Sequence, residues 1–238
     1  MKPTELEMER ALDIIRDLIP YGLHEAIKGE KKDGNGFFED AKDYADKNGI
    51  SFFFGASKLV IVDEESDWVI KLSFDCSADV DEGMEVDYCK RELYNYEKAC
   101  EEGVEKFFAE IHRIGEVDGI EVYLQEKLKV NDGVEEDVDQ IFRDYVYSLD
   151  ESYYDDIEDE DERDAVLSDG VYEMDEGERV EAVFGFEERL ITFIENNDIN
   201  DLHSGNFGYR GTDLVIMDYS GWNVYSIKER EKDNEEDE

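Results

Sequence analysis

The stretch DLHSGNFGYRGTDLVIMDYSG, residues 201–221, decides how the rest of the chain is interpreted. Asp201 and Asn206 stand in a polar, glycine-containing segment, and the apolar run LVIM then leads to Asp218. A loop that carries an Asp and an Asn, followed by a strand hairpin ending in a second Asp, can bring all three side chains together. In a chain this acidic, an Asp after an apolar strand is common. The prediction therefore depends on the whole string and not on Asp218 alone.

These residue types suit chemistry on a nucleoside triphosphate. A carboxylate beside an acceptor hydroxyl can take its proton during phosphoryl transfer. An Asp carboxylate and an Asn amide supply the oxygen ligands that Mg²⁺ needs on the β- and γ-phosphates. The segment is therefore a candidate catalytic loop followed by a metal-binding residue.

The strings DLHSGN and VIMDYSG resemble the catalytic loop and metal-binding motif of the protein kinase-like superfamily. The similarity is greatest to aminoglycoside and choline kinase relatives, whose loops often read DLHxGN. The resemblance implies that Asp201 is the catalytic residue at the acceptor hydroxyl and that Asn206 and Asp218 bind the metals. It also implies ATP and Mg²⁺ (or Mn²⁺) as cofactors, with a hydroxyl of a protein or small molecule as the acceptor.

The same resemblance predicts a strand lysine that holds the phosphates and a helix glutamate that holds the lysine. Lys71 in WVIKLSF occupies the lysine position, and Glu92 on the following helix is the expected partner. Glu97 on the same helix is the alternative. Taken alone, Lys71 lies on the strand face opposite its apolar neighbours Ile70 and Leu72, where a solvent-facing lysine is ordinary.

Two further segments resemble nucleotide-binding elements of the family. FGASKLVIV resembles a shortened phosphate-covering loop, although a plain hairpin turn would have the same sequence features. VYLQEKL resembles the strand that leads into the hinge beside adenine. The residues implicated are Gly55 and Ser57 in the first segment, with Gln125 as gatekeeper and the backbone of Glu126 to Leu128 in the second.

The pattern of apolar residues predicts an α+β protein. A helical run over 5–28 is interrupted by Pro20, and a second helix is expected over 37–47. Short runs rich in β-branched and aromatic residues indicate strands. The expected strands are 50–55, 58–63, 68–74, 107–114 and 120–128, with helices over 86–102 and 182–196.

These elements predict a two-lobed, kinase-like fold. We expect an N-lobe with a five-stranded antiparallel sheet and one key helix, and a reduced, mostly helical C-lobe. The expected division is a helical extension over 1–49, the N-lobe over 50–130, the C-lobe over 131–225 and a charged tail over 226–238.

The charge of the chain excludes several partners. It has 68 acidic and 25 basic residues, for a formal net charge of −43, so nucleic acids and anionic membrane surfaces would be repelled. No apolar run is long enough to cross a bilayer, and no signal peptide is evident, which predicts a cytoplasmic protein. Cys76, Cys89 and Cys100 show no metal-binding spacing and are expected to be reduced thiols.

Residues 132–182 are dominated by Asp and Glu and predict a solvated loop or helix face. The run could instead hold cations loosely or contact a basic protein partner. Two functions therefore stand after the sequence analysis. The first is an ATP-dependent phosphotransferase, and the alternative is an inactive pseudokinase or acidic interaction module that binds a basic surface.

Overall fold

The computed structural model describes residues 2–28, 35–55, 57–74, 87–130, 133–157 and 159–221. These residues form two compact units, the first drawn from residues 1–98 and 109–127 and the second from 99–108 and 128–223. The division passes through helix α4 (Tyr88–Glu102) and again directly after strand β5 (Ile120–Glu126). The fold is α+β, with an antiparallel sheet in the first unit and mostly helices in the second.

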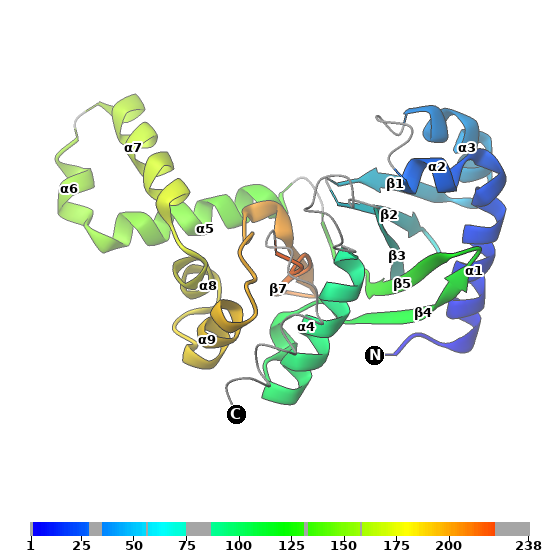
Figure 1. Cartoon of the computed structure of the whole chain (residues 1–238). Coiled ribbons are helices and arrows are strands. Elements are labelled where there is room, and N and C mark those ends of the chain that lie inside the picture. Colours follow the sequence, from blue (N-terminus) through cyan, green and yellow to red (C-terminus); the bar gives the residue numbers. More distant parts are fainter. Residues whose placement is uncertain are drawn as a thin grey trace, which may run out of the picture. The chain divides into compact units, whose positions relative to one another are not determined.

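The sheet of the first unit has five described strands in the order β1-β2-β3-β5-β4, and all neighbours are antiparallel (Figure 1). The strands besides β5 are β1 (Ile50–Phe54), β2 (Lys58–Asp63), β3 (Trp68–Ser73) and β4 (Ile111–Val117). The prediction that a strand begins at 107 was wrong. The amides of Phe107 and Phe108 bond locally to Val104 and Glu105, forming the short 3-10 helix η2 (Glu105–Phe107).

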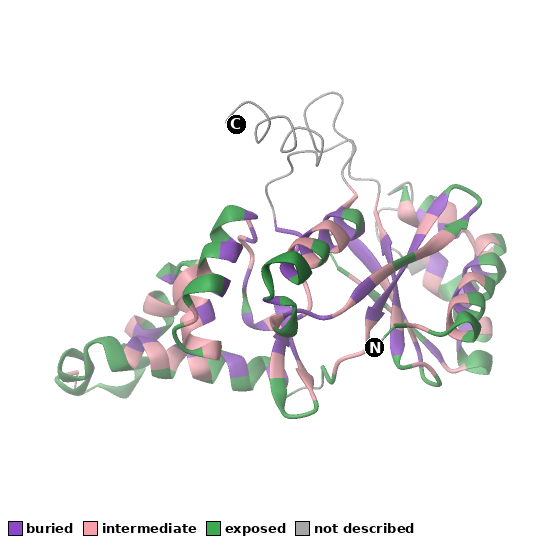
Figure 2. Ribbon diagram, turned by 90° about the horizontal axis from the view of Figure 1, so that it is seen from below, coloured by how far each residue is buried: buried purple, intermediate pink, exposed green. Residues whose placement is uncertain are grey.

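Alternation along the strands gives the sheet two different faces. One face is apolar and is covered by α1 (Glu5–Leu18), α2 (Leu23–Ile27) and α3 (Asn35–Asn48), as Figures 1 and 2 show. The strand residues in this core are Ile50, Leu59, Ile61, Trp68, Ile70, Leu72, Val117, Ile120, Val122 and Leu124. The residues between them, including Lys71, therefore lie on the other face, where α4 packs.

The interruption predicted at Pro20 separates helix α1 from helix α2. Thr4 and Glu7 form a capping box at the start of α1, each satisfying a backbone amide of the other. After Leu18 the chain enters a 3-10 turn that contains Pro20, because proline cannot continue an α-helix. Gly22 then adopts a φ of 92° and begins α2 in a new direction.

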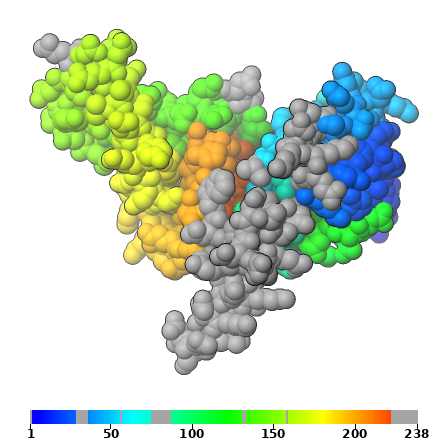
Figure 3. Space-filling model, turned by 45° about the horizontal axis from the view of Figure 1, so that its top comes forward, coloured from blue at the N-terminus to red at the C-terminus, as the bar shows by residue number. Residues whose placement is uncertain are grey.

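The second unit contains α5 (Val134–Leu149), α6 (Glu151–Asp155), α7 (Glu160–Glu173), α8 (Glu176–Phe184) and α9 (Glu188–Asn196). A 3-10 turn, η3 (Ser204–Asn206), and a hairpin of β6 (Phe207–Arg210) and β7 (Asp213–Ile216) follow. Its core includes Val138, Phe142, Val146, Val180, Leu190 and Phe193. The acidic stretch is thus folded into helices, of which α6 and α7 form exposed surface (Figure 3).

The prediction of one helix over 182–196 was wrong. Helix α8 ends at Phe184, and Gly185 has a φ of 75°, which an α-helix does not allow. Its amide still bonds to the carbonyl of Glu181 and so caps α8. The apolar pattern resumes only in α9, from Glu188 onward.

Several expectations fall partly or wholly outside the described residues. These are the thiol of Cys76 and the charged tail over 226–238. Cys89 is buried and Cys100 is exposed. None of the described helices combines the length and apolar composition needed to cross a bilayer.

A pair of substitutions tests whether α3 is part of the core of the first unit. Phe37 on α3 has no exposed surface, and its ring packs edge-on against Phe52 of β1 at 5.2 Å. We expect Phe37→Ala to lower the free energy of unfolding by about 3–5 kcal/mol in urea titrations. Phe53→Ala is the control, because Phe53 is 58% exposed on the same strand and should change stability little. Equal losses in the two variants would contradict the packing.

Candidate functional site

The start of helix α4 is held by one local hydrogen bond and by two contacts to the sheet. The amide of Tyr88 donates to Ser73 Oγ at the end of β3 (2.9 Å), and the amide of Lys90 donates to Asp87 Oδ1 (2.9 Å). The Tyr123 hydroxyl of β5 donates to Asp87 Oδ2 (3.3 Å). Burial raises the pKa of Asp87, although these hydrogen bonds oppose that shift. The register of α4 against the strands is thereby set.

One turn farther along α4, Glu92 lies against the polar face of the sheet with no exposed side-chain surface. Lys71 Nζ on β3 donates to both carboxylate oxygens of Glu92, at 2.7 and 2.9 Å, and to Gln125 Oε1 at 3.2 Å. Lys58 Nζ on β2 also donates to Glu92 Oε1, at 2.7 Å. Glu97, the alternative partner considered for Lys71, is exposed.

Burying these charged groups costs free energy. The side chains of Lys58 and Lys71 are only 4% and 5% exposed. Removing a charge from water costs several kcal/mol, which a buried pair recovers only with close geometry and hydrogen bonds. Glu92 meets this requirement with distances below 3 Å to both ammonium groups. Burial, reinforced by the Glu92 charge, raises the pKa of neighbouring Cys89, which remains a thiol.

The sequence analysis missed Lys58, although the sequence contains a signal for it. In the β2–β3 hairpin Val60 pairs with Lys71 and Lys58 pairs with Ser73. Lys58 is thus two residues from the position opposite Lys71 and must share its face. Carrying the alternation across the predicted hairpin would have placed both lysines on one face, whereas the phosphate contact was predicted for Ser57 or the backbone amides near Gly55.

The other predicted nucleotide contacts lie in turns and at the end of β5. The Gly55 amide bonds to the Lys58 carbonyl across the β1–β2 turn. The Ser57 carbonyl accepts from the Phe74 amide and extends the β2–β3 pairing by one residue. The Glu126 amide donates to the Glu110 carbonyl within the first unit. Leu128 belongs to the second unit, where it packs closely against Gly208 of β6.

Within the second unit, hydrogen bonds to the backbone bring the predicted catalytic-loop residues together. Asn206 Nδ2 donates to the Asp201 carbonyl at 2.5 Å and holds the loop closed. The Met217 amide donates to the Asn206 carbonyl at 2.9 Å, so Asp218 directly follows a residue bonded to Asn206. Ser220 Oγ donates to Asp218 Oδ1 at 3.1 Å. Asp201 and Asp218 are both partly exposed, and Asn206 is buried.

Two glycines of this segment are required by close packing. Gly221 has a φ of 69°, and a side chain there would overlap the carbonyl oxygen of Asp198, just before the loop. A Cβ at Gly205 would lie 3.0 Å from the imidazole of His203. That imidazole accepts a hydrogen bond from the Gly205 amide at 3.1 Å, which stabilises the loop. Gly221 of DYSG thus lies against the backbone that leads into DLHSGN, and the Gly205–His203 contact is local to that string.

Arg179 on α8 is a positioning residue that the sequence analysis did not identify. Its guanidinium donates to the carbonyls of Val171 (2.9 Å), Met174 (3.2 Å) and Leu202 (3.5 Å) and lies over the Phe142 ring. The bond to Leu202 reaches the residue after Asp201. Contacts to backbone carbonyls leave no sequence pattern, so no motif indicated this role.

The oxygen atoms of Asn206 and Asp218 suit a magnesium ion that is held mainly by phosphate groups. The bond from Asn206 Nδ2 to the loop leaves the amide oxygen as the atom with which Asn206 would bind a metal. Asp218 supplies a carboxylate next to Met217, whose amide is bonded to the Asn206 carbonyl. The described residues contain no cluster of three or more His, Cys, Asp or Glu side chains suited to a metal. Mg²⁺ commonly binds one or two protein oxygens plus phosphates and water, which matches this pair.

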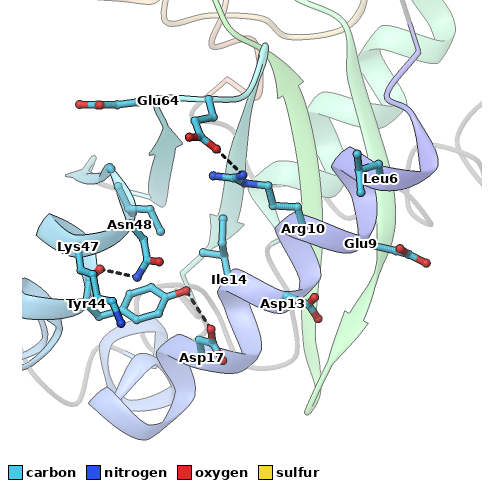
Figure 4. A pocket seen from close by; sticks show the side chains of 13 residues that line it. Leu6, Glu9, Arg10, Asp13, Ile14, Asp17, Tyr44, Lys47, Asn48 and Glu64 are labelled. Carbon is cyan, nitrogen blue, oxygen red and sulfur yellow. Dashed lines mark hydrogen bonds and ion pairs between the residues drawn. The ribbon is translucent and has the colours of Figure 1, made fainter.

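A pocket of about 570 Å³ in the first unit does not contain the predicted site residues. It lies at α1, α3 and the β2–β3 turn, on the side of the helices that cover the sheet face opposite Lys71 (Figure 4). Arg10, Tyr44 and several carboxylates line it, and Tyr44 donates to Asp17 Oδ2. The predicted site residues therefore lie in two other groups. The Lys71 cluster, Lys58, Lys71 and Glu92, is in the first unit, and the Asp201 cluster, Asp201, Asn206 and Asp218, is in the second.

The shared carboxylate predicts an order of stabilities. Glu92→Gln leaves two buried ammonium groups without their carboxylate and should lower the free energy of unfolding by about 3–5 kcal/mol. Lys58→Met should cost much less, because Glu92 keeps both contacts to Lys71. Lys90→Met on exposed α4 surface controls for the lost positive charge. Urea titrations measure all three, and a Lys58→Met loss equal to that of Glu92→Gln would contradict this account.

Comparisons of the chain with models of protein families, with curated proteins and with solved structures found no match. The kinase-like fold therefore stays a prediction from the sequence motifs.

Proposed function

We propose that the chain is an ATP-dependent phosphotransferase with a two-lobed, kinase-like fold. The observation that carries the proposal is the buried contact of Lys71 on β3 with Glu92 on α4, at 2.7 Å. The sequence motifs implied this pair of residues, which are 21 positions apart. Phosphotransferases of this type use such a pair to hold a lysine toward the phosphates of ATP.

The first unit would hold the nucleotide phosphates. Glu92 fixes the Lys71 ammonium on the polar face of the sheet, so the charge is positioned before a ligand arrives. Gln125 contacts the same ammonium from β5, consistent with its expected position beside the nucleotide. The amides of Glu126 and Lys127 bond to Glu110 and Asp67, so adenine would use other backbone groups of this stretch.

The second unit would hold the metal and the acceptor. Asn206 Oδ1 and the Asp218 carboxylate are the proposed ligands, and bound Mg²⁺ would neutralise charge on the phosphate oxygens. The bonds of Asn206 to Asp201 and of Met217 to Asn206 keep these residues in a fixed arrangement. Arg179 supports the loop through the Leu202 carbonyl.

In the proposed reaction the acceptor oxygen attacks the γ-phosphorus of ATP. The bond from that phosphorus to the bridging oxygen breaks, ADP leaves, and the acceptor proton passes to the Asp201 carboxylate. Asp201 is partly exposed, as a group that meets an acceptor must be. The acceptor is a hydroxyl of a protein or of a small molecule.

One observation favours a second function, an acidic module that binds a basic protein. Helix α7 begins with Glu160, Asp161 and Glu162 and has Leu167 as its buried residue. Tyr172 near its end is 86% exposed, and exposed tyrosines are common anchors of protein interfaces. Such a function would not depend on Asp201, whereas phosphoryl transfer would.

Turnover of ATP tests the proposal. Incubated with Mg·ATP, the wild-type chain should form ADP, with water or its own hydroxyl groups as the acceptor. Asp201→Asn should lower kcat by about 10²–10⁴-fold with little change in ATP affinity, because it removes the proton acceptor and leaves the phosphate contacts. Phosphorus NMR measures ATP and ADP directly.

Asp213→Asn is the matched control, since Asp213 is exposed on β7 of the same unit and should leave the rate unchanged. If the wild type forms no ADP, or if the two variants form it at the same rate, the proposal fails and the acidic module becomes the better account.

A further inference from the structure

A groove in the first unit contains none of the proposed phosphate- or metal-binding residues. It is the pocket of about 570 Å³ between α1, α3 and the β2–β3 turn (Figure 4). Pockets that bind ligands usually measure about 300–1,000 Å³. The groove is therefore a candidate binding site to which the proposed reaction gives no role.

One wall of the groove is a face of α1 that carries a row of carboxylates. Glu9, Asp13 and Asp17 are four residues apart, so they follow one another on one side of the helix in steps of about 6 Å along its axis. Leu6 lies about one turn before Glu9 and is 75% exposed although it is apolar. A ligand along this wall would meet one apolar side chain and then regularly spaced negative charges.

The groove also has an apolar and aromatic lining. Ile14 of α1 and Ile50 of β1 line it and are buried, and Tyr44 lines it from α3. The Tyr44 hydroxyl donates to Asp17 Oδ2 at 3.2 Å. Burial, together with the Asp17 charge, raises the pKa of Tyr44 to about 12. Tyr44 thus keeps its proton at neutral pH and presents an uncharged ring to the groove.

The cations of the lining do not neutralise its acids. Five of the described lining residues are Asp or Glu, and two are cations, Arg10 and Lys47. The Arg10 guanidinium donates to both carboxylate oxygens of the buried Asp63 and to Glu65. Its single charge is therefore shared by two carboxylates, which leaves Lys47 against the other acids of the described lining.

Three carboxylates of the lining have no cationic partner among the described residues. Asp13 pairs with Arg16, whereas Glu9, Asp17 and Glu64 form no ion pair with any described side chain. The acids of the described chain also form no cluster of three or more that could hold a metal ion. The negative charges are spread along the groove, which suits a ligand whose positive charges are spread in the same way.

We propose that this groove binds an extended basic segment of a partner protein, with lysine or arginine at alternate positions and an apolar residue at one end. Alternate side chains of an extended chain lie on one side, about 6–7 Å apart, close to the roughly 6 Å steps between Glu9, Asp13 and Asp17. The apolar residue would pack on Leu6, and the methylene groups of a lysine on the Tyr44 ring.

The chemistry of the groove favours this partner over other ligands. Nucleic acids and anionic lipids are repelled by carboxylates. A linear polyamine would match the spaced charges and would leave the exposed Leu6 uncovered. The inference goes beyond the proposed phosphotransferase and does not depend on it, because no groove residue takes part in the proposed reaction.

Calorimetric titration with synthetic peptides tests the proposal. The probe has one terminal leucine followed by alternating serine and lysine, and a second peptide has serine in place of the leucine. The wild type should bind the leucine peptide at one site, about 3- to 10-fold more tightly than the serine peptide. Glu9→Gln/Glu64→Gln should bind the leucine peptide about 3- to 10-fold more weakly than the wild type, because exposed ion pairs contribute modestly.

The matched control is Glu39→Gln/Asp43→Asn, which removes two exposed carboxylates from α3 outside the groove. Both double variants lose two negative charges, so the general attraction of a polycation to this acidic chain falls equally in both. The control should bind the leucine peptide within about twofold of the wild type. Equal affinities of the two double variants overturn the inference. Binding of spermine by the wild type as tight as that of the leucine peptide also overturns it, in favour of a polyamine.

A measurement on the wild type locates the peptide without any substitution. In chains with ¹³C-methyl-labelled leucine, the leucine peptide should shift the methyl resonances of Leu6. Those of Leu149, which is 62% exposed at the end of α5, should stay unchanged. An unshifted Leu6 at saturating peptide overturns the inference, and a shift of Leu149 alone would place the peptide on the acidic helices of the second unit instead.

Discussion

The carboxylate of Glu92 joins helix α4 to the sheet of the first unit. It has no exposed surface and meets ammonium groups from two neighbouring strands, Lys58 on β2 and Lys71 on β3. Because an unpaired buried charge is so costly, the position of α4 and the direction of both lysines are coupled. The cap at Asp87 and the bond from Tyr88 to Ser73 fix the start of the same helix.

The covering of the sheet makes this buried cluster possible. The apolar face packs against α1, α2 and α3, so hydrophobic burial is supplied there, through residues such as Phe37, Ile70 and Leu72. The opposite face is then available for polar groups, and α4 shields them from water. In the second unit, the bond from the Met217 amide to the Asn206 carbonyl and the close approach of Gly221 to the Asp198 carbonyl hold the DYSG segment beside the DLHSGN segment.

Much of this arrangement could be predicted from the sequence, because strands and motif spacing leave local patterns. The strand sequence and the residues Lys71 and Glu92 were identified in this way. The single helix over 182–196 was predicted wrongly, since the apolar pattern continues across Gly185 while its φ of 75° does not show in the sequence. Lys58 required the hairpin register, and Arg179 acts on backbone carbonyls, which carry no side-chain signature.

Calorimetric titration of the folded chain with Mg·ATP tests the central claim most directly. The account predicts saturable one-site binding by the wild type and by Lys90→Met, and loss of binding in Lys71→Met and Asp218→Asn. Loss in both would mean that Lys71 in the first unit and Asp218 in the second unit serve the same ligand. Binding of equal strength in all four chains, or no binding by the folded wild type, would contradict the account.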